Sequence, residues 1–264
     1  MIELLSYGFM RNALLGGFAI ALSCGLIGPF LVLRRLSLLG DGLAHLAFGG
    51  IALGLLLGIN PLFSALIVVV GGSFWVKSLM NRNVYGDSAI ALLLSLGVGM
   101  GIVIIGIVRG FNTSLYSYLI GSILALSRTD IFLSFTLLAA TGIFFALFYQ
   151  DMFYNTFNEE LAKLSRKRIK LANFFFTVLV AMVVVLSIRA VGILLVSALL
   201  VIPTLIALHL GKSFKQTMYL SALSAMLAVS IGIIVSFVAD IPPSGSIVLL
   251  LFLGFVVTQF LRRK

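Results

Sequence analysis

The sequence has 264 residues, of which 61% are hydrophobic and only 10% are charged. Soluble domains carry roughly 25% charged residues, and a mean hydropathy of +1.23 leaves too few polar residues to cover a surface that faces water. This composition excludes a soluble domain and indicates a chain that lies mostly in lipid. The net charge of +10 does not indicate a nucleic-acid partner, because the basic residues stand between apolar segments.

Nine apolar runs have about the 20 residues that cross a bilayer, and residues such as Gly, Pro and Asn separate them. The runs are 11–33, 41–58, 61–80, 87–108, 130–149, 172–189, 190–210, 215–238 and 244–261. The weakest break lies at 187–189, within a stretch that is too long for one span. We therefore predict an all-α, polytopic helical bundle of about nine spans, forming one domain over residues 1–264 in the cell inner membrane.

The 18 lysine and arginine residues indicate how the spans are oriented. Cytoplasmic loops of membrane proteins are enriched in these two residues. If the first span ends in the cytoplasm, 14 of the 18 fall inside. The four that remain outside are Arg11, Arg109, Arg128 and Arg189. We therefore expect the N-terminus outside and the C-terminus in the cytoplasm.

In the second span, Asp41 and His45 are the clearest functional candidates, because ionisable residues within spans are rare and costly. They are four residues apart, so a helix places them on one face. A carboxylate and an imidazole at this spacing could bind Zn²⁺, Mn²⁺ or Fe²⁺ together. Alternatively, the carboxylate caps the start of the helix and the histidine bonds to a neighbouring helix. Under the metal-binding reading, the remaining ligands must come from other helices.

The segment 151–170, between the fifth and sixth spans, has an amphipathic pattern. Steps of four, four and three residues form one apolar stripe, made of Phe153, Phe157, Leu161 and Leu164. Acidic residues precede a basic run, as the helix dipole favours. Such a helix could lie on anionic headgroups or dock into a groove of a partner protein.

Two features of the later spans are weaker indications of a pathway. Pro203 lies inside the seventh span, where it frees a backbone carbonyl and should kink the helix. Asp240 closes the eighth span beside Pro242 and Pro243. At this outer mouth its carboxylate could attract incoming cations, although a helix cap would explain the position equally well.

Several stretches resemble the permease subunits of ABC importers for zinc, manganese and related metals. The strongest likeness is in residues 28–35 (GPFLVLRR) and 40–50 (GDGLAHLAFGG). Further likeness occurs in residues 117–124, 191–203 and 243–249, so the resemblance runs through nearly the whole chain. The positions that depart from the pattern common in relatives are Ala44, Gly49, Ser165 and Thr204.

The resemblance implies a transport subunit rather than an enzyme, with ATP hydrolysed by separate cytoplasmic ATPase subunits. It also implies a second permease subunit, in a homodimer or related pair, and an extracytoplasmic metal-binding protein. The cargo would be a zinc, manganese or iron ion, no cofactor would be bound permanently, and transport would proceed by alternating access. Asp41, His45 and Asp240 would line the metal path. Within a coupling segment over 151–170, the ATPase would contact Phe157, Glu159, Glu160, Leu161, Ala162 and Lys163.

Three other functions remain open. The same architecture could import a metal chelate or a vitamin, which would favour a wide path with few charged ligands. A passive channel would need no ATPase. An intramembrane metalloenzyme could hold a catalytic metal at Asp41 and His45, although the sequence lacks an H-E-x-x-H motif.

Overall fold

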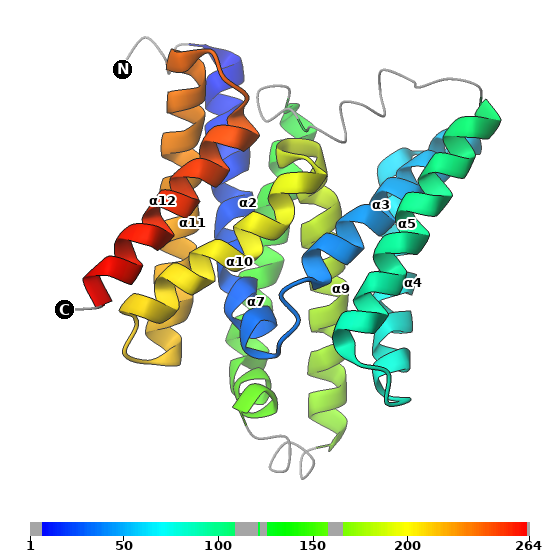
Figure 1. Cartoon of the computed structure of the whole chain (residues 1–264), viewed down its shortest axis with the longest axis horizontal. Helices are drawn as coiled ribbons and strands as arrows, with labels where there is room; N and C mark the ends of the chain where they lie inside the picture. Colours follow the sequence, from blue (N-terminus) through cyan, green and yellow to red (C-terminus); the bar gives the residue numbers. More distant parts are fainter. Residues whose placement is uncertain (1–6, 109–120, 122–125, 158–165, 263–264) are drawn as a thin grey trace.

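The computed structural model describes residues 7–108, 121, 126–157 and 166–262, and no residue in these ranges lies in a strand. The helices of these ranges, shown in Figure 1, are α2 (Gly8–Leu33), α3 (Leu39–Leu56), α4 (Pro61–Met80), α5 (Gly86–Val108), α7 (Arg128–Phe157), α9 (Arg166–Val191), α10 (Ile193–Leu210), α11 (Phe214–Ala239) and α12 (Pro243–Arg262). The predicted all-α fold is confirmed, and each of the nine predicted spans corresponds to one helix.

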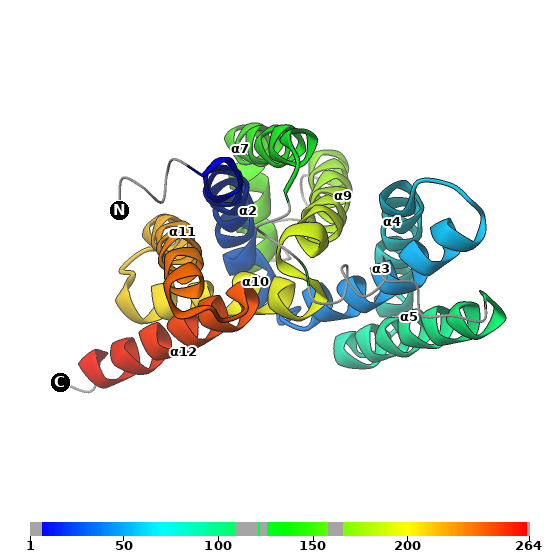
Figure 2. The ribbon, with the colours of Figure 1, turned by 90° about the horizontal axis from the view of Figure 1, so that it is seen from above.

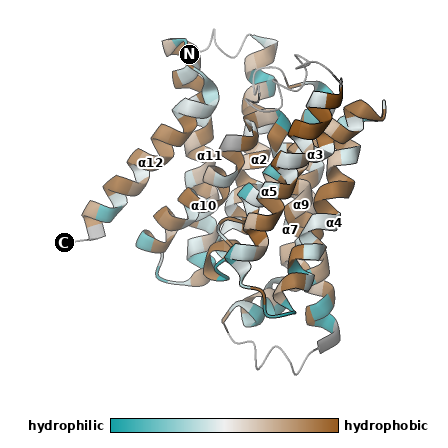
Figure 3. Ribbon diagram, turned by 45° about the vertical axis from the view of Figure 1, so that its right-hand side comes forward, coloured by the Kyte–Doolittle hydropathy of each residue, from teal (hydrophilic) through white to brown (hydrophobic). Residues whose placement is uncertain are grey.

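The helices match a lipid environment in length and in surface. Eight of those described are long and apolar enough to cross a membrane, and α10 contains a shorter apolar stretch, Leu195–Leu210. Large apolar side chains such as Phe132, Ile102 and Leu249 remain more than half exposed on the isolated chain, and apolar residues run along the outward faces in Figure 3. A surface of this kind is stable against lipid but not against water. The chain is therefore a multi-pass membrane protein.

The helices form three neighbouring groups, which Figures 1 and 2 show from two directions. α2, α7 and α9 lie in the middle. α3, α4 and α5 form one flank, and α10, α11 and α12 form the other. Contacts across the groups join α2 to α11 and α4 to α9, and α10 also contacts α3. Both flanking groups are therefore tied to the central helices.

The break between α9 and α10 lies at Gly192, three residues after the predicted break at 187–189. Gly192 has φ 79° and ψ 166°, a conformation that is essentially restricted to glycine. Gly121 packs closely here, because a Cβ on Gly121 would lie 2.1 Å from the backbone nitrogen of Gly192. The predicted boundary was wrong because α9 continues through Arg189 to Val191, and the glycine that makes the turn follows it.

The predicted amphipathic segment is divided between two long helices where the structure describes it. Residues up to Phe157 continue α7, and residues from Arg166 onward belong to α9. The rings of Phe153 and Phe157 at the end of α7 both pack against Phe214, at centroid distances of 5.5 Å each. The other predicted coupling residues lie outside the described residues, and they are Glu159, Glu160, Leu161, Ala162 and Lys163.

Two ion pairs join α7 to α9, one toward each end of this helix pair. Arg189 donates to Asp130 Oδ1 at 2.6 Å, and Asp130 Oδ2 accepts from the backbone nitrogen and hydroxyl of Ser127 at 2.9 and 2.6 Å. At the other end, Arg168 Nε lies 2.9 Å from Asp151 Oδ2. The Arg189 side chain is 43% exposed and that of Arg168 is 67% exposed, so water solvates the second pair more fully.

We expect Arg189→Gln to destabilise the chain more than Arg168→Gln. The first change leaves the buried carboxylate of Asp130 without its cation, a type of loss that commonly costs about 3 kcal/mol. The second removes a more solvated pair, which commonly contributes less than about 1 kcal/mol. Thermal unfolding of the two purified variants in detergent measures the difference. Equal shifts in melting temperature would contradict this assignment.

Candidate functional site

Asp41 and His45 share one face of α3, as predicted. Asp41 lies in the first turn of the helix, and His45 Nε2 lies 3.7 Å from Asp41 Oδ1. This separation is longer than a hydrogen bond. The side chains of His45 and Asp41 are 25% and 34% exposed. The pair is therefore accessible to a third group that could be bound by both side chains.

The start of α3 places this pair within the height of the bundle. After α2 ends, the chain turns back through residues 34–38, and α3 begins partway up the bundle rather than at its lower end (Figure 1). The turn contains Arg35 in a left-handed conformation, with φ 58°. Ionisable groups at this depth are unfavourable unless they are paired or serve a pathway. The position of α3 therefore adds to the case for function.

Ser197 of α10 is a third member of the site, which the sequence did not indicate. Its hydroxyl donates to Asp41 Oδ1 at 3.3 Å, although the two residues are 156 positions apart. Ser197 lies within residues 191–203, one of the stretches that carry the family resemblance. The resemblance includes this stretch but does not predict that Ser197 contacts Asp41, because that contact depends on how α10 packs against α3.

Close packing fixes the backbone of α3 at the site. A Cβ on Gly97 of α5 would lie 2.4 Å from the carbonyl oxygen of His45 and 2.5 Å from the Cα of Leu46. On α3 itself, a Cβ on Gly40 would lie 2.7 Å from a methyl carbon of Leu200 on α10. Helix α3 therefore packs directly against α5 and α10 at the level where Asp41 and His45 project.

The described residues supply only part of a metal coordination shell around Asp41 and His45. Within the described ranges, no group of three or more His, Cys, Asp or Glu residues is placed to hold a metal ion. Asp41 and His45 offer two strong ligands, and the Ser197 hydroxyl offers a weaker oxygen. Protein-bound zinc generally takes four ligands and manganese suits octahedral oxygen-rich sites. A metal held by this pair would need ligands from beyond it.

The remaining predicted site residues lie elsewhere. Asp240 is the exposed C-cap of α11, with φ 53° and ψ 44°, and it does not join Asp41 and His45 in a group of three. Pro203 lies inside α10, where its carbonyl accepts a hydrogen bond from the Ser224 hydroxyl at 3.4 Å. A metal role for Asp240 and a kink at Pro203 stay predictions.

Comparisons with known proteins cover almost the whole chain. Residues 6–262 match the family described as the ABC 3 transport family. A probable metal transport system membrane protein of Thermotoga maritima is 30% identical over 96% of this chain and 90% of its own. The manganese transport system membrane protein MntC of Halalkalibacterium halodurans is 29% identical over 99% and 90%, respectively. The structure of PsaBC from Streptococcus pneumoniae in complex with Fab contains a chain with a TM-score of 0.86 and 27% identity, covering 97% of this chain and 93% of that chain.

We expect Gly97→Ala to destabilise the chain, because the new Cβ would meet backbone atoms of α3 that cannot move without shifting His45. Overpacking of this kind typically costs about 1–3 kcal/mol. Gly99→Ala is the matched control on the same helix, since a Cβ on Gly99 meets nothing within 4 Å. Thermal unfolding in detergent should show a lower melting temperature for the first variant only. An equal effect of both changes would argue against close packing at Gly97.

Proposed function

The chain belongs to the ABC 3 transport family, and from this premise we propose that it is the membrane-spanning permease of an ATP-driven importer for a divalent transition-metal ion. The observation that carries the proposal is the accessible Asp41–His45 pair near the start of α3. Ionisable side chains at membrane depth characteristically mark ion pathways. In this role the chain is a transport subunit and not an enzyme, and ATP is hydrolysed by separate cytoplasmic ATPase subunits.

Manganese is the ion that the names of two relatives favour. The similar protein of Halalkalibacterium halodurans is named a manganese transport system membrane protein. A relative in Streptococcus parasanguinis, 28% identical, is named the manganese import system permease protein ScaB. Carboxylate and hydroxyl oxygens suit Mn²⁺, and imidazole is compatible with it. Zinc and iron use the same ligand types, so the three ions must be separated by measurement.

A second permease copy would complete the coordination shell. Asp41 and His45 stay a third and a quarter exposed on the single chain, which leaves room for ligands from another molecule. In a symmetric homodimer, the same pair would be contributed by both copies, giving two carboxylates and two imidazoles. An extracytoplasmic metal-binding protein would deliver the ion to the outer end of this path. With the N-terminus outside and the C-terminus in the cytoplasm, Asp240 would lie at this outer end and its carboxylate would attract the ion.

The end of α7 is the proposed contact for the ATPase. Phe157 is 55% exposed there, within the predicted coupling segment 151–170. Its ring packs on Phe153 at 4.9 Å and on Phe214 at 5.5 Å. Phe214 begins α11 and also packs edge-on against Phe30 of α2, at 4.9 Å. Movement of this segment would therefore reach two other helices through packed rings, which supports transport by alternating access.

Competing functions differ in what they require of the site. A chelate or vitamin importer has less need of the accessible carboxylate–imidazole pair, a passive channel has no need of an ATPase, and a metalloenzyme would need a complete catalytic ligand set. If an ATPase co-purifies with the chain and this association depends on the end of α7, the proposed importer is distinguished from a passive channel and from a metalloenzyme. Uptake of a free ion, measured without a chelator, distinguishes the proposed importer from an importer of a chelate or a vitamin.

We expect Asp41→Asn and His45→Gln to abolish most metal accumulation, because each removes one of the two strong ligands. Cells that depend on this chain would be grown under metal limitation, and their manganese, zinc and iron measured by mass spectrometry. Loss of one ligand should lower uptake of the transported ion at least about ten-fold, the effect of about 1.4 kcal/mol.

Asp87→Asn is the matched control, since Asp87 is an exposed carboxylate in the first turn of α5. All variants are compared at equal amounts of membrane-inserted protein. Uptake that persists in both site variants would refute the metal-path role. Loss of manganese alone would identify the cargo.

We expect Phe157→Ala to weaken association with the ATPase and to lower uptake, because it removes an exposed ring from the end of α7. Phe237→Ala is the matched control, since Phe237 is a partly exposed aromatic residue near the opposite end of α11 from Phe214. The measurement is the amount of ATPase that co-purifies with each variant. Equal recovery with both variants would remove Phe157 from the contact.

A further inference from the structure

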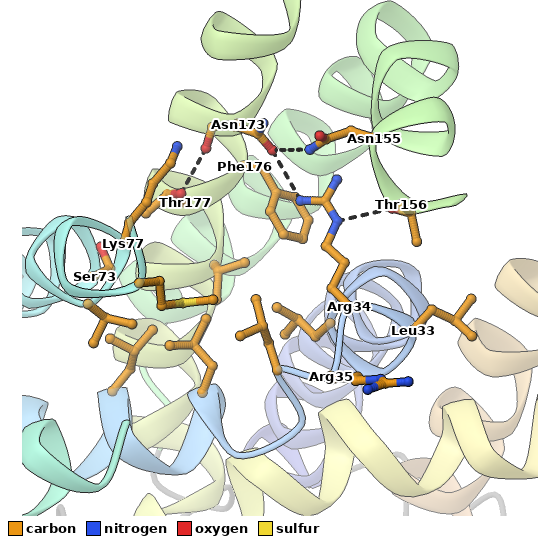
Figure 4. Close-up of a pocket in the computed structure, with 17 residues that line it drawn as sticks. Leu33, Arg34, Arg35, Ser73, Lys77, Asn155, Thr156, Asn173, Phe176 and Thr177 are labelled. Carbon is orange, nitrogen blue, oxygen red and sulfur yellow. Dashed lines mark hydrogen bonds between the residues drawn. The ribbon is translucent and has the colours of Figure 1, made fainter. Parts of the chain in front are cut away.

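A cavity of about 430 Å³ lies between the end of α2, the turn that follows it, and helices α3, α4, α7 and α9. Figure 4 shows its polar side chains. Lys77 reaches in from α4, and Arg34 reaches in from the end of α2, both toward the part of α9 that carries Asn173. Met80 at the edge of the cavity is 37% exposed, so the cavity opens to the surface of the chain.

The described residues that line the cavity include cations and no anion. Arg34, Arg35 and Lys77 belong to its lining, and none of the described lining residues is Asp or Glu. Lys77 is only partly exposed, and the ion pairs found in the described ranges do not include it. A partly buried ammonium without a counter-charge is unfavourable. The cavity therefore favours an anionic ligand.

A hydrogen-bonded frame holds Arg34 in place. Its Nε donates to the Thr156 hydroxyl at 3.0 Å, and its Nη1 donates to Asn173 Oδ1 at 3.1 Å. Asn155 Nδ2 donates to the same Asn173 oxygen at 2.8 Å, and the guanidinium lies 5.3 Å from the centre of the Phe176 ring. Arg34 is therefore a fixed positive charge, held by α7 and α9 rather than free to leave.

Lys77 supplies hydrogen-bond donors for a ligand on a flexible side chain, whereas the Arg34 side chain is held in place. An ammonium carries three N–H donors on a flexible stem, and no hydrogen bond from Lys77 occurs within the described residues. Asn173 offers a further donor. Its side-chain oxygen already accepts two hydrogen bonds, and its side-chain amide nitrogen can still donate. Phosphate oxygens are strong acceptors for such groups.

The cavity is separate from the proposed metal path. Leu39 and Leu43 of α3 line it, whereas Asp41 and His45 each follow two residues later. Two residues turn a helix by about 200°, so the pair projects from the opposite face of α3. The positive charge of the cavity would also repel a divalent cation.

We propose that this cavity binds a phosphate-bearing anion, with Lys77 as a direct ligand and Arg34 as the fixed charge beside it. Basic pockets between membrane helices suit the headgroups of acidic lipids, and inorganic phosphate offers the same chemistry from water. The proposal does not depend on metal transport, and its test contains neither metal nor ATPase. The anion site and the proposed transport function can therefore be refuted separately.

The test measures the melting temperature of the purified full chain in detergent with two probes. One probe is phosphatidylglycerol compared with phosphatidylcholine, and the other is sodium phosphate compared with sodium chloride at equal ionic strength. Variants are Lys77→Gln, Lys77→Arg and the control Lys170→Gln, which removes an exposed charge of α9 outside the cavity lining. Native mass spectrometry counts the lipid that each variant retains.

We expect at least one probe to raise the melting temperature of the wild type and of Lys170→Gln, and Lys77→Gln to lose more than half of that rise. The affinity should fall about five-fold, the usual contribution of one basic residue near an acidic headgroup, and Lys77→Arg should keep most of it. A rise with phosphatidylglycerol alone identifies a lipid headgroup, and a rise with phosphate identifies a soluble anion.

Lys77 also lies in the last turn of α4, where a cation stabilises the helix end. A lower melting temperature for Lys77→Gln that is independent of both probes would assign Lys77 to that role and overturn the proposal.

Discussion

Lipid offers no hydrogen bonds, and this constraint determines most of the structure. Every backbone polar group inside the bilayer must be satisfied by the chain itself, which permits helices and excludes open strands. The same constraint makes each ionisable side chain at membrane depth costly. Asp41 and His45 stand out for this reason. They share one face of α3, with 3.7 Å between His45 Nε2 and Asp41 Oδ1, and both remain partly exposed.

The site depends on how three helices meet rather than on loops. α3 begins within the bundle, α10 contributes the Ser197 hydroxyl to Asp41, and α5 approaches His45 closely through Gly97. The described part of one chain still offers no group of three strong metal ligands. An incomplete and accessible site fits the proposal that a permease forms the pathway with a second copy and releases its cargo.

Much of the fold could be predicted from the sequence, because apolar length and the spacing of polar residues are local signals. The nine helices of the described ranges, and the shared face of Asp41 and His45, follow from them. The break between α9 and α10 was predicted at 187–189, three residues before Gly192, because the glycine that makes the turn comes after the residues that separate the two apolar runs. Ser197 and the cavity beside Lys77 were missed because both depend on contacts between helices far apart in the chain. The coupling residues 159–163 lie outside the described residues and stay a prediction.

We propose that Asp41 and His45 bind the transported ion together. Pulsed electron paramagnetic resonance of Mn²⁺ added to the purified chain tests it directly, because a bound imidazole nitrogen gives a measurable coupling to the metal electron spin. We expect this nitrogen coupling in the wild-type chain and its loss in His45→Gln. Bound Mn²⁺ with no nitrogen coupling, or with a coupling that persists in His45→Gln, would contradict it.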